Sequence, residues 1–303
     1  MSTDTTNSVD SPATPARITV GYLATASGDD GVALAVALAR ATGACIDLVC
    51  VVRSEEPDGT PGRASYQDML IRRAREWVAA GADLVPDDVT VEVHTPVAES
   101  FTEGLIDFAD ASGARLIVVG GTRDGLLGRH TLGSISSELV HWSPLPVALA
   151  PRGYAERDEV VLDSLTVAVP TTGRSDNPLP FAVALAEEAH LALRLVSLVS
   201  LDDAGDLDTE TSAQTRARHI SAATDILDEA TRRAPSTLSV ESVVADGDTL
   251  SEALDSLRWG EGDLVAVGSA RLGPPSRAFL GSTAARILRN TTAPMIVVPK
   301  AAD

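Results

Sequence analysis

Two kinds of hydrophobic pattern alternate along the chain. Short runs of Val, Ile and Leu are typical of buried strands, and longer segments with apolar residues three and four positions apart indicate amphipathic helices. Parallel strands need helical crossovers, so the alternation predicts an α/β fold of the doubly wound, Rossmann-like class with a mainly parallel five-stranded sheet. In the first half the patterns predict strands over 17–23, 45–52, 89–95, 115–120 and 146–150, and helices over 29–41, 66–84, 99–111 and 133–142.

The same pattern occurs twice. Leu-Ile-Val-Val-Gly at 116–120 recurs as Leu-Val-Ala-Val-Gly at 264–268, and Gly133-Ser134 recurs as Gly281-Ser282. Both pairs are 148 residues apart, and such a constant spacing marks a duplicated domain. The 303 residues therefore divide into a disordered tail (1–16), a first domain (17–151), a charge-rich linker (152–163) and a second domain (164–303).

Charge narrows the classes of partner. The chain has 43 acidic and 24 basic residues, a formal net charge of −19, and Lys300 is its single lysine. A protein that binds nucleic acid or an anionic membrane surface needs the opposite sign, so neither partner is expected. The start of the chain lacks the basic and apolar regions of a signal peptide, and no apolar run is long enough to span a membrane. We therefore expect a cytoplasmic protein.

The cysteines and histidines indicate structural rather than chemical roles. Cys45 and Cys50 are five positions apart on one predicted strand, which places them on opposite faces and predicts buried, unbridged thiols. His130 has Ala278 at its repeat position, so a catalytic base shared by both copies is not expected there. The other histidines have no metal-ligand spacing: His94, His141, His190 and His219. No catalytic residue and no metal site is predicted. We expect Trp77 and Trp142 to pack against the sheet, and the acidic stretch 201–210 to be a solvated loop.

The loop after the fourth strand of each copy carries the candidate chemistry. Ligands of doubly wound sheets bind beyond the carboxyl ends of the strands, where the strand order reverses. A glycine lets the backbone turn off the strand, a Gly-Ser pair opens a helix whose free N–H groups suit a phosphate, and an arginine adds a charged fork. The phosphate-loop residues predicted on these grounds are Gly120, Arg123, Gly133 and Ser134, repeated as Gly268, Arg271, Gly281 and Ser282.

These loops resemble those of the universal stress protein family in its tandem, two-domain form. The resemblance covers residues 17–300 and implies the Rossmann-like fold of the adenine-nucleotide-alpha-hydrolase-like type. Nucleotide-binding members carry Gly-x-x-Gly-x9-Gly-Ser/Thr in this loop, and here Arg123 and Arg271 replace the second glycine. ATP-binding members also have an aspartate at the end of the first strand, where this chain has Val-Gly-Tyr-Leu23 and Val-Ala-Val-Pro170. The nearby Asp29 and Asp176 are predicted to be helix N-caps rather than nucleoside ligands.

Three functions stay open. The first is a non-enzymatic stress-response or regulatory protein that requires no cofactor. The second is a protein that binds ATP or another adenine nucleotide and hydrolyses it slowly, and the third is a scaffold that binds unidentified protein partners through its acidic surface. The resemblance also implies an internal pseudo-dimer, in which strands 147–150 and 295–298 pair. A further homodimer of whole chains stays open.

Overall fold

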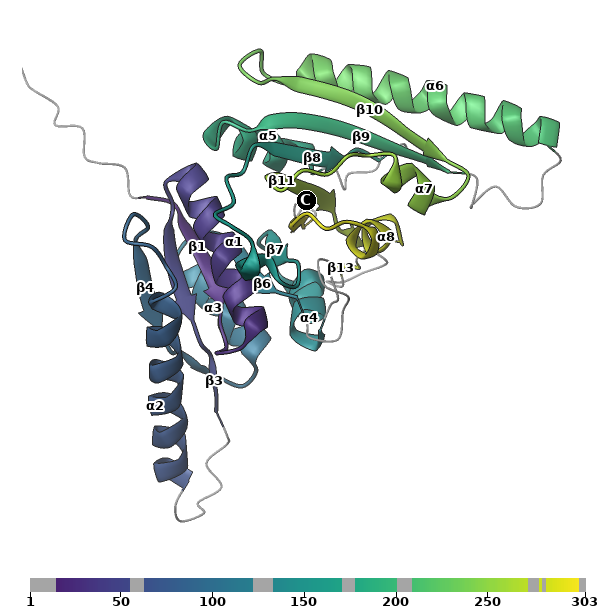
Figure 1. The fold of residues 1–303 in the computed structure, drawn as a ribbon. Coiled ribbons are helices and arrows are strands. Elements are labelled where there is room, and N and C mark those ends of the chain that lie inside the picture. Colours follow the sequence, from purple (N-terminus) through teal and green to yellow (C-terminus); the bar gives the residue numbers. More distant parts are fainter. Residues whose placement is uncertain are drawn as a thin grey trace, which may run out of the picture.

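One continuous sheet of ten strands runs through the computed structural model, which describes residues 15–54, 63–121, 133–170, 178–200, 209–271, 278–279 and 282–299 (Figure 1). The strand order is β10-β9-β8-β11-β14-β7-β6-β1-β2-β4. The elements of the first half are β1 (Arg17–Gly21), α1 (Ala26–Thr42), β2 (Cys45–Val49), β3 (Val52–Arg53), α2 (Arg63–Ala82), β4 (Val91–His94), β5 (Val97–Ala98), α3 (Phe101–Ala111), β6 (Ala114–Gly120), α4 (Ser134–Trp142) and β7 (Val147–Ala150).

The second half repeats this order. Its elements are β8 (Ser164–Ala168), α5 (Leu179–Glu188), β9 (Ala192–Ser200), α6 (Thr209–Arg233), β10 (Val240–Gly247), α7 (Leu250–Asp255), β11 (Asp263–Gly268), β12 (Ala270–Arg271), β13 (Ala278–Phe279), α8 (Ser282–Asn290) and β14 (Met295–Val298). Each half contributes five strands in the same spatial order, with its first strand between its second and fourth, so the predicted doubly wound fold is confirmed. Two short pairs, β3 with β5 and β12 with β13, lie outside the large sheet and were not predicted.

The two halves meet at their closing strands. Strands β7 and β14 are antiparallel, with Ala148 opposite Ile296, whereas every other strand pair of the large sheet is parallel. All four residues of β7 and the first three of β14 are buried. The pairing expected from the family resemblance is therefore present, and it leaves β4 and β10 as the edges of the sheet.

Helices cover the sheet on both faces. Helices α1 and α2 pack on one face of the first half and α3 and α4 on the other, with the equivalent arrangement in the second half (Figure 1). Thr25 is the N-cap of helix α1, and its hydroxyl accepts a hydrogen bond from the Gly28 N–H at 3.2 Å. Gly43, with φ +69°, is the C-cap. The prediction that Asp29 caps this helix is therefore wrong, because Asp29 lies in its first turn. Asp176 is outside the described residues.

The linker between the halves is packed rather than solvated. A short 3₁₀ helix (Tyr154–Glu156) places the Tyr154 ring in the core, where it is 2% exposed. The buried Asp30 carboxylate of α1 accepts hydrogen bonds from the backbone N–H groups of Gly153 and Ala155, each at 2.9 Å. The charged residues of this stretch are exposed or partly exposed, whereas Tyr154 and Leu162 are buried.

Removal of the Asp30 carboxylate should release the linker. We expect Asp30→Ala to lower the free energy of unfolding by about 1–2 kcal/mol at pH 7, since two backbone N–H groups lose their acceptors. Burial raises the pKa of Asp30 above its usual range, so its contribution to stability is largest in acid and falls as the pH rises through the folded-state pKa. The difference between the variant and the wild type in urea unfolding should thus be larger at pH 4.5 than at pH 8. Asp158→Asn, an exposed change in the same segment, is the control, and equal differences at both pH values would contradict the prediction.

Three further expectations can be compared with the structure. Trp142 does not pack into the core. Helix α4 buries Ser136, Leu139 and Val140, whereas Trp142, its last residue, lies off the buried face and is 49% exposed. Both cysteines are free, but only Cys50 is fully buried, and burial raises the pKa of its thiol to about 11. Residues 209–210 of the acidic stretch belong to α6. Its other residues, 201–208, lie outside the described part of the chain, as do residues 1–14 of the tail and His130. None of the described helices combines the length and the apolar character needed to cross a membrane.

Candidate functional site

A small cavity opens at the point where the strand order of the first half reverses. It has a volume of about 150 Å³ and lies where β1 and β6, which are neighbours in the sheet, reach their carboxyl ends. The starts of α1 and α4 form its other walls. Its lining consists of Gly21, Leu23, Thr25, Ser27, Gly28, Phe101, Val119, Gly120, Gly133, Ser134, Ile135 and Ser136. This is the crevice in which doubly wound sheets bind their ligands.

The predicted loop residues of the first copy meet in this cavity as far as they are described. Gly120, Gly133 and Ser134 all line it. Residues 122–132 between them, which include Arg123, lie outside the described part of the chain. In the second copy Gly268 ends β11, Arg271 ends β12 and Ser282 begins α8, whereas Gly281 is outside the described residues. The structure therefore brings Gly120, Gly133 and Ser134 together, and it describes neither Arg123 of the first set nor Gly281 of the second.

Gly120 is required for close packing rather than for an unusual turn. Its φ is not positive, in contrast to the expectation that glycine frees the backbone to leave the strand. A Cβ at this position would lie 1.7 Å from the carbonyl oxygen of Ser27, in the first turn of α1. The missing side chain thus lets the start of α1 rest directly on the end of β6, which closes the floor of the cavity.

The start of α4 lies against the cavity, and no side chain of the described residues caps it. Gly133 is its N-cap residue and supplies no side-chain cap, so the first N–H groups of the helix keep their hydrogen-bonding capacity. The Ser136 hydroxyl donates to the Gly120 carbonyl oxygen at 3.4 Å and ties the helix to β6. A helix start in this state, with its partial positive charge, suits an anionic or strongly polar ligand group.

The segment Val-Gly-Tyr-Leu23, at the end of the first strand where ATP-binding members carry an aspartate, has Leu23 in the cavity lining and Tyr22 turned into the core. The Tyr22 ring is 3% exposed and packs in the core on the α1 and α2 face, and its hydroxyl donates to Asp29 Oδ1 at 3.2 Å. Burial, with a smaller contribution from Asp29, raises the pKa of the phenol to about 12. Neither the tyrosine nor Asp29 lines the cavity, so no side-chain carboxylate among the described lining residues replaces the missing one.

The sequence prediction missed nine of the twelve lining residues. Leu23, Thr25 and Ser27 follow β1, and Phe101 begins α3 behind its N-cap residue Ser100. The rule that places ligands at strand ends applies to the loop after β1 as well as to the loop after β6, and Thr25 with Gly28 was the available signal for a helix start there.

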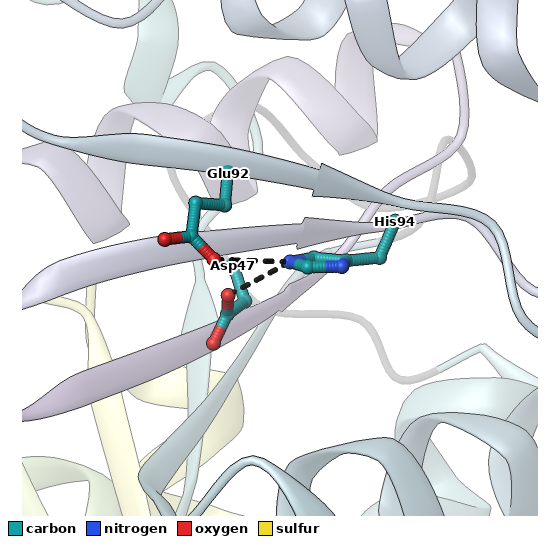
Figure 2. Close-up of side chains that lie close together, drawn as sticks. All are labelled: Asp47, Glu92 and His94. Atoms are coloured by element: carbon teal, nitrogen blue, oxygen red, sulfur yellow. Dashed lines mark hydrogen bonds and ion pairs between the residues drawn. The ribbon is translucent and has the colours of Figure 1, made fainter.

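A polar cluster lies apart from this cavity, on β2 and β4. Figure 2 shows the side chains of Asp47, Glu92 and His94 converging. The distance from His94 Nε2 is 3.0 Å to Asp47 Oδ1 and 3.8 Å to Glu92 Oε2. The Arg17 guanidinium of β1 contacts both carboxylates, with 2.7 Å between its Nη2 and Glu92 Oε2. Contrary to the expectation from spacing, His94 therefore belongs to a group of residues with metal-ligand chemistry, which strand pairing assembles.

Comparison with known proteins shows which protein family the chain matches. The model of the universal stress protein family matches residues 16–151 and 163–299. Universal stress protein Rv2319c of Mycobacterium tuberculosis is 26% identical over 292 residues, which cover 93% of this chain and 99% of that protein. A universal stress protein from Archaeoglobus fulgidus DSM 4304 has a similar structure, with a TM-score of 0.61, 18% identity, and coverage of 94% of this chain and 98% of that one.

A second solved structure is shorter. The universal stress protein from Archaeoglobus fulgidus in complex with dAMP matches 45% of this chain and 98% of its own length, with 17% identity and a TM-score of 0.35. The family matches to both halves cover most of the sequence, and the two halves have the same strand order. The chain therefore belongs to the universal stress protein family, as a tandem of two family domains.

Proposed function

We propose that this chain is a non-enzymatic stress-response or regulatory protein whose nucleotide-binding loops are degenerate. The observation that carries the proposal is the lining of the cavity at the ends of β1 and β6. Among the described residues it consists of glycines, hydroxyl groups and apolar side chains, without a carboxylate, imidazole or guanidinium. Hydrolysis of a phosphoanhydride needs a group that orients water and charges that offset those of the phosphates, and the described lining has neither a basic nor a cationic side chain for these roles.

The size of the cavity supports the same proposal. Its volume of about 150 Å³ is below the range of about 300–1,000 Å³ typical of small-molecule sites. Because Leu23, and no carboxylate, lines the cavity after β1, a nucleoside would lack the charged partner that the family's ATP-binding members use, a loss of about 1.5–3 kcal/mol. Regulation would then act through protein partners, for which the acidic surface of a chain of net charge −19 is available.

The start of α4 favours one alternative, a protein that binds ATP or another adenine nucleotide. The uncapped helix start and Ser134 could hold a phosphate without any basic side chain. Slow hydrolysis would be a further property of such a complex.

Calorimetric titration of the full chain with ATP, ADP and AMP distinguishes the two. We expect no saturable binding at 1 mM nucleotide, equivalent to a binding free energy weaker than about −4 kcal/mol, and no adenine nucleotide released from the purified protein by acid. A Kd below about 100 μM for one of these nucleotides would favour the alternative, provided that Ser134→Glu abolishes binding by adding a negative charge at the start of α4. Ser251→Glu, in the first turn of α7, adds the same charge at a helix remote from the cavity and is the control. Phosphate release from ATP that is lost in Ser134→Glu alone would contradict the non-enzymatic proposal.

A further inference from the structure

The polar cluster on β2 and β4 is built on rigid elements. Asp47 pairs with Glu92 and Val49 pairs with His94 in parallel register, so all of these side chains face the same side of the sheet. Asp47 is fully buried, and the ring of Phe108 from α3 packs on His94 with 4.6 Å between the ring centroids. One ligand atom from each of Asp47, Glu92 and His94 lies within 4.8 Å of the other two (Figure 2).

A buried hydroxyl beside the cluster is without a partner. Thr19 on β1 is 0% exposed, and its Oγ1 has no hydrogen-bond partner in the part of the chain that the structure describes. Thr19 pairs with Asp47 in the register of β1 and β2, so both side chains stand next to each other on the same face of the sheet. Buried hydroxyls without a partner are uncommon in folded proteins, and that of Thr19 has hydrogen-bonding capacity to spare beside Asp47.

The second half provides an internal comparison. The equivalent strand pair, β8 with β9, places Arg194 opposite Thr166, where the first half has Asp47 opposite Thr19. Arg194 Nε donates to the Thr166 hydroxyl at 2.8 Å, and its Nη2 lies 3.3 Å from Asp263 Oδ2. The second half therefore has a cation beside its threonine. In the first half that place is taken by a carboxylate, and Arg17 is hydrogen-bonded to the carboxylates rather than to Thr19.

We propose that Asp47, Glu92 and His94 bind a divalent transition-metal ion, of which Zn²⁺ is the best match. Two carboxylate oxygens and one imidazole nitrogen are ligands that Zn²⁺ takes at about 2.0–2.2 Å, and three protein ligands leave a position for water. Such a water would give the Thr19 hydroxyl the partner that it lacks. The two carboxylates already draw a cation to this point, since the Arg17 guanidinium contacts both.

Arg17 is then a competitor for the metal position. Its side chain is 22% exposed, so it has a route to solvent when an ion takes its place between the carboxylates. The charge of the ion replaces the charge of the guanidinium, which keeps the buried Asp47 paired in both states. This competition predicts that removal of the guanidinium strengthens metal binding.

Titration of the metal-free full chain with ZnCl₂ tests the site. We expect one Zn²⁺ per chain by calorimetry, an affinity at least about tenfold lower in His94→Ala and Glu92→Gln, and an affinity at least about tenfold higher in Arg17→Met. His219→Ala, at an exposed histidine of α6, and Glu241→Gln, at the position in β10 equivalent to Glu92, should bind as the wild type does. Far-UV circular dichroism and the urea midpoint of each variant report whether it is folded.

Substitution of Co²⁺ for Zn²⁺ adds a spectroscopic test. A bound Co²⁺ should give visible absorption bands that His94→Ala alters and His219→Ala does not. The proposal is overturned if neither the wild type nor a folded Arg17→Met variant binds Zn²⁺ at 1 mM, in which case the cluster is a closed ion-pair network. It is equally overturned if binding is unchanged in both His94→Ala and Glu92→Gln.

Discussion

An Ile296→Asp variant is expected to lose at least about 4 kcal/mol of unfolding free energy. Ile296 is fully buried in the middle of β14, between Ala266 of β11 and Ala148 of β7. The substitution removes an apolar side chain from the core and places a carboxylate there without a partner. Because β14 also joins the two halves, the loss affects the whole ten-stranded sheet. Urea unfolding followed by circular dichroism measures it.

A milder and a matched substitution accompany this prediction. Ile296→Ala removes most of the side chain without adding charge and should lower the unfolding free energy by about 3 kcal/mol. This variant can still be measured if the aspartate variant does not fold. Val161→Asp introduces the same carboxylate at a linker position that is 76% exposed and should change the free energy by less than about 0.5 kcal/mol. Similar stabilities of Ile296→Asp and Val161→Asp would refute the buried junction between β7 and β14.

A Gly120→Ala variant is expected to be destabilised by about 3 kcal/mol, a large effect for one methyl group. The added Cβ would lie 1.7 Å from the Ser27 carbonyl oxygen and 2.6 Å from its carbonyl carbon. Backbone atoms cannot swing away as a side chain does, so the first turn of α1 must move off the end of β6. The same movement would open the floor of the cavity. Chemical unfolding gives the free energy, and hydrogen exchange at α1 reports the displacement.

Gly260→Ala is the control for the intrinsic effect of replacing glycine. The nearest atom to a Cβ at that position is 3.6 Å away, which is ordinary contact, and its φ is not positive. Its stability should remain within about 0.5–1 kcal/mol of the wild type. If Gly120→Ala behaved in the same way, the close seating of α1 on β6 would be wrong.

The fold could be predicted because its signals are local and repeated. Runs such as 116–120 are apolar throughout because a parallel strand is buried on both faces, and the intervening helices carry one apolar side. The duplication gave each prediction a second instance, and the fixed order of a doubly wound sheet brought Gly120 and Gly133 together. Element ends were less predictable: the chain has a threonine and an aspartate near the start of α1, and only the structure shows that Thr25 caps it.

The polar cluster could not be predicted because it depends on the register between strands. Asp47 and Glu92 are 45 positions apart, and they meet because β2 and β4 pair with these residues side by side. Spacing rules for metal ligands apply to residues on one helix or one turn and do not detect such a set. The available signal was the exchange of Asp47 for Arg194 between the two copies, which becomes informative only when the strands are aligned.

The junction between the halves has a consequence for self-recognition. Ala148 and Ile296 occupy equivalent positions of the two repeats and face each other across β7 and β14, a small side chain against a large one. In a symmetric pair of identical domains each of these residues would face its own copy. Two first domains would leave a gap between alanines, and two second domains would crowd two β-branched side chains. Each half is therefore shaped to fit the other half and not a second copy of itself, which disfavours pairing of two first domains or of two second domains from different chains.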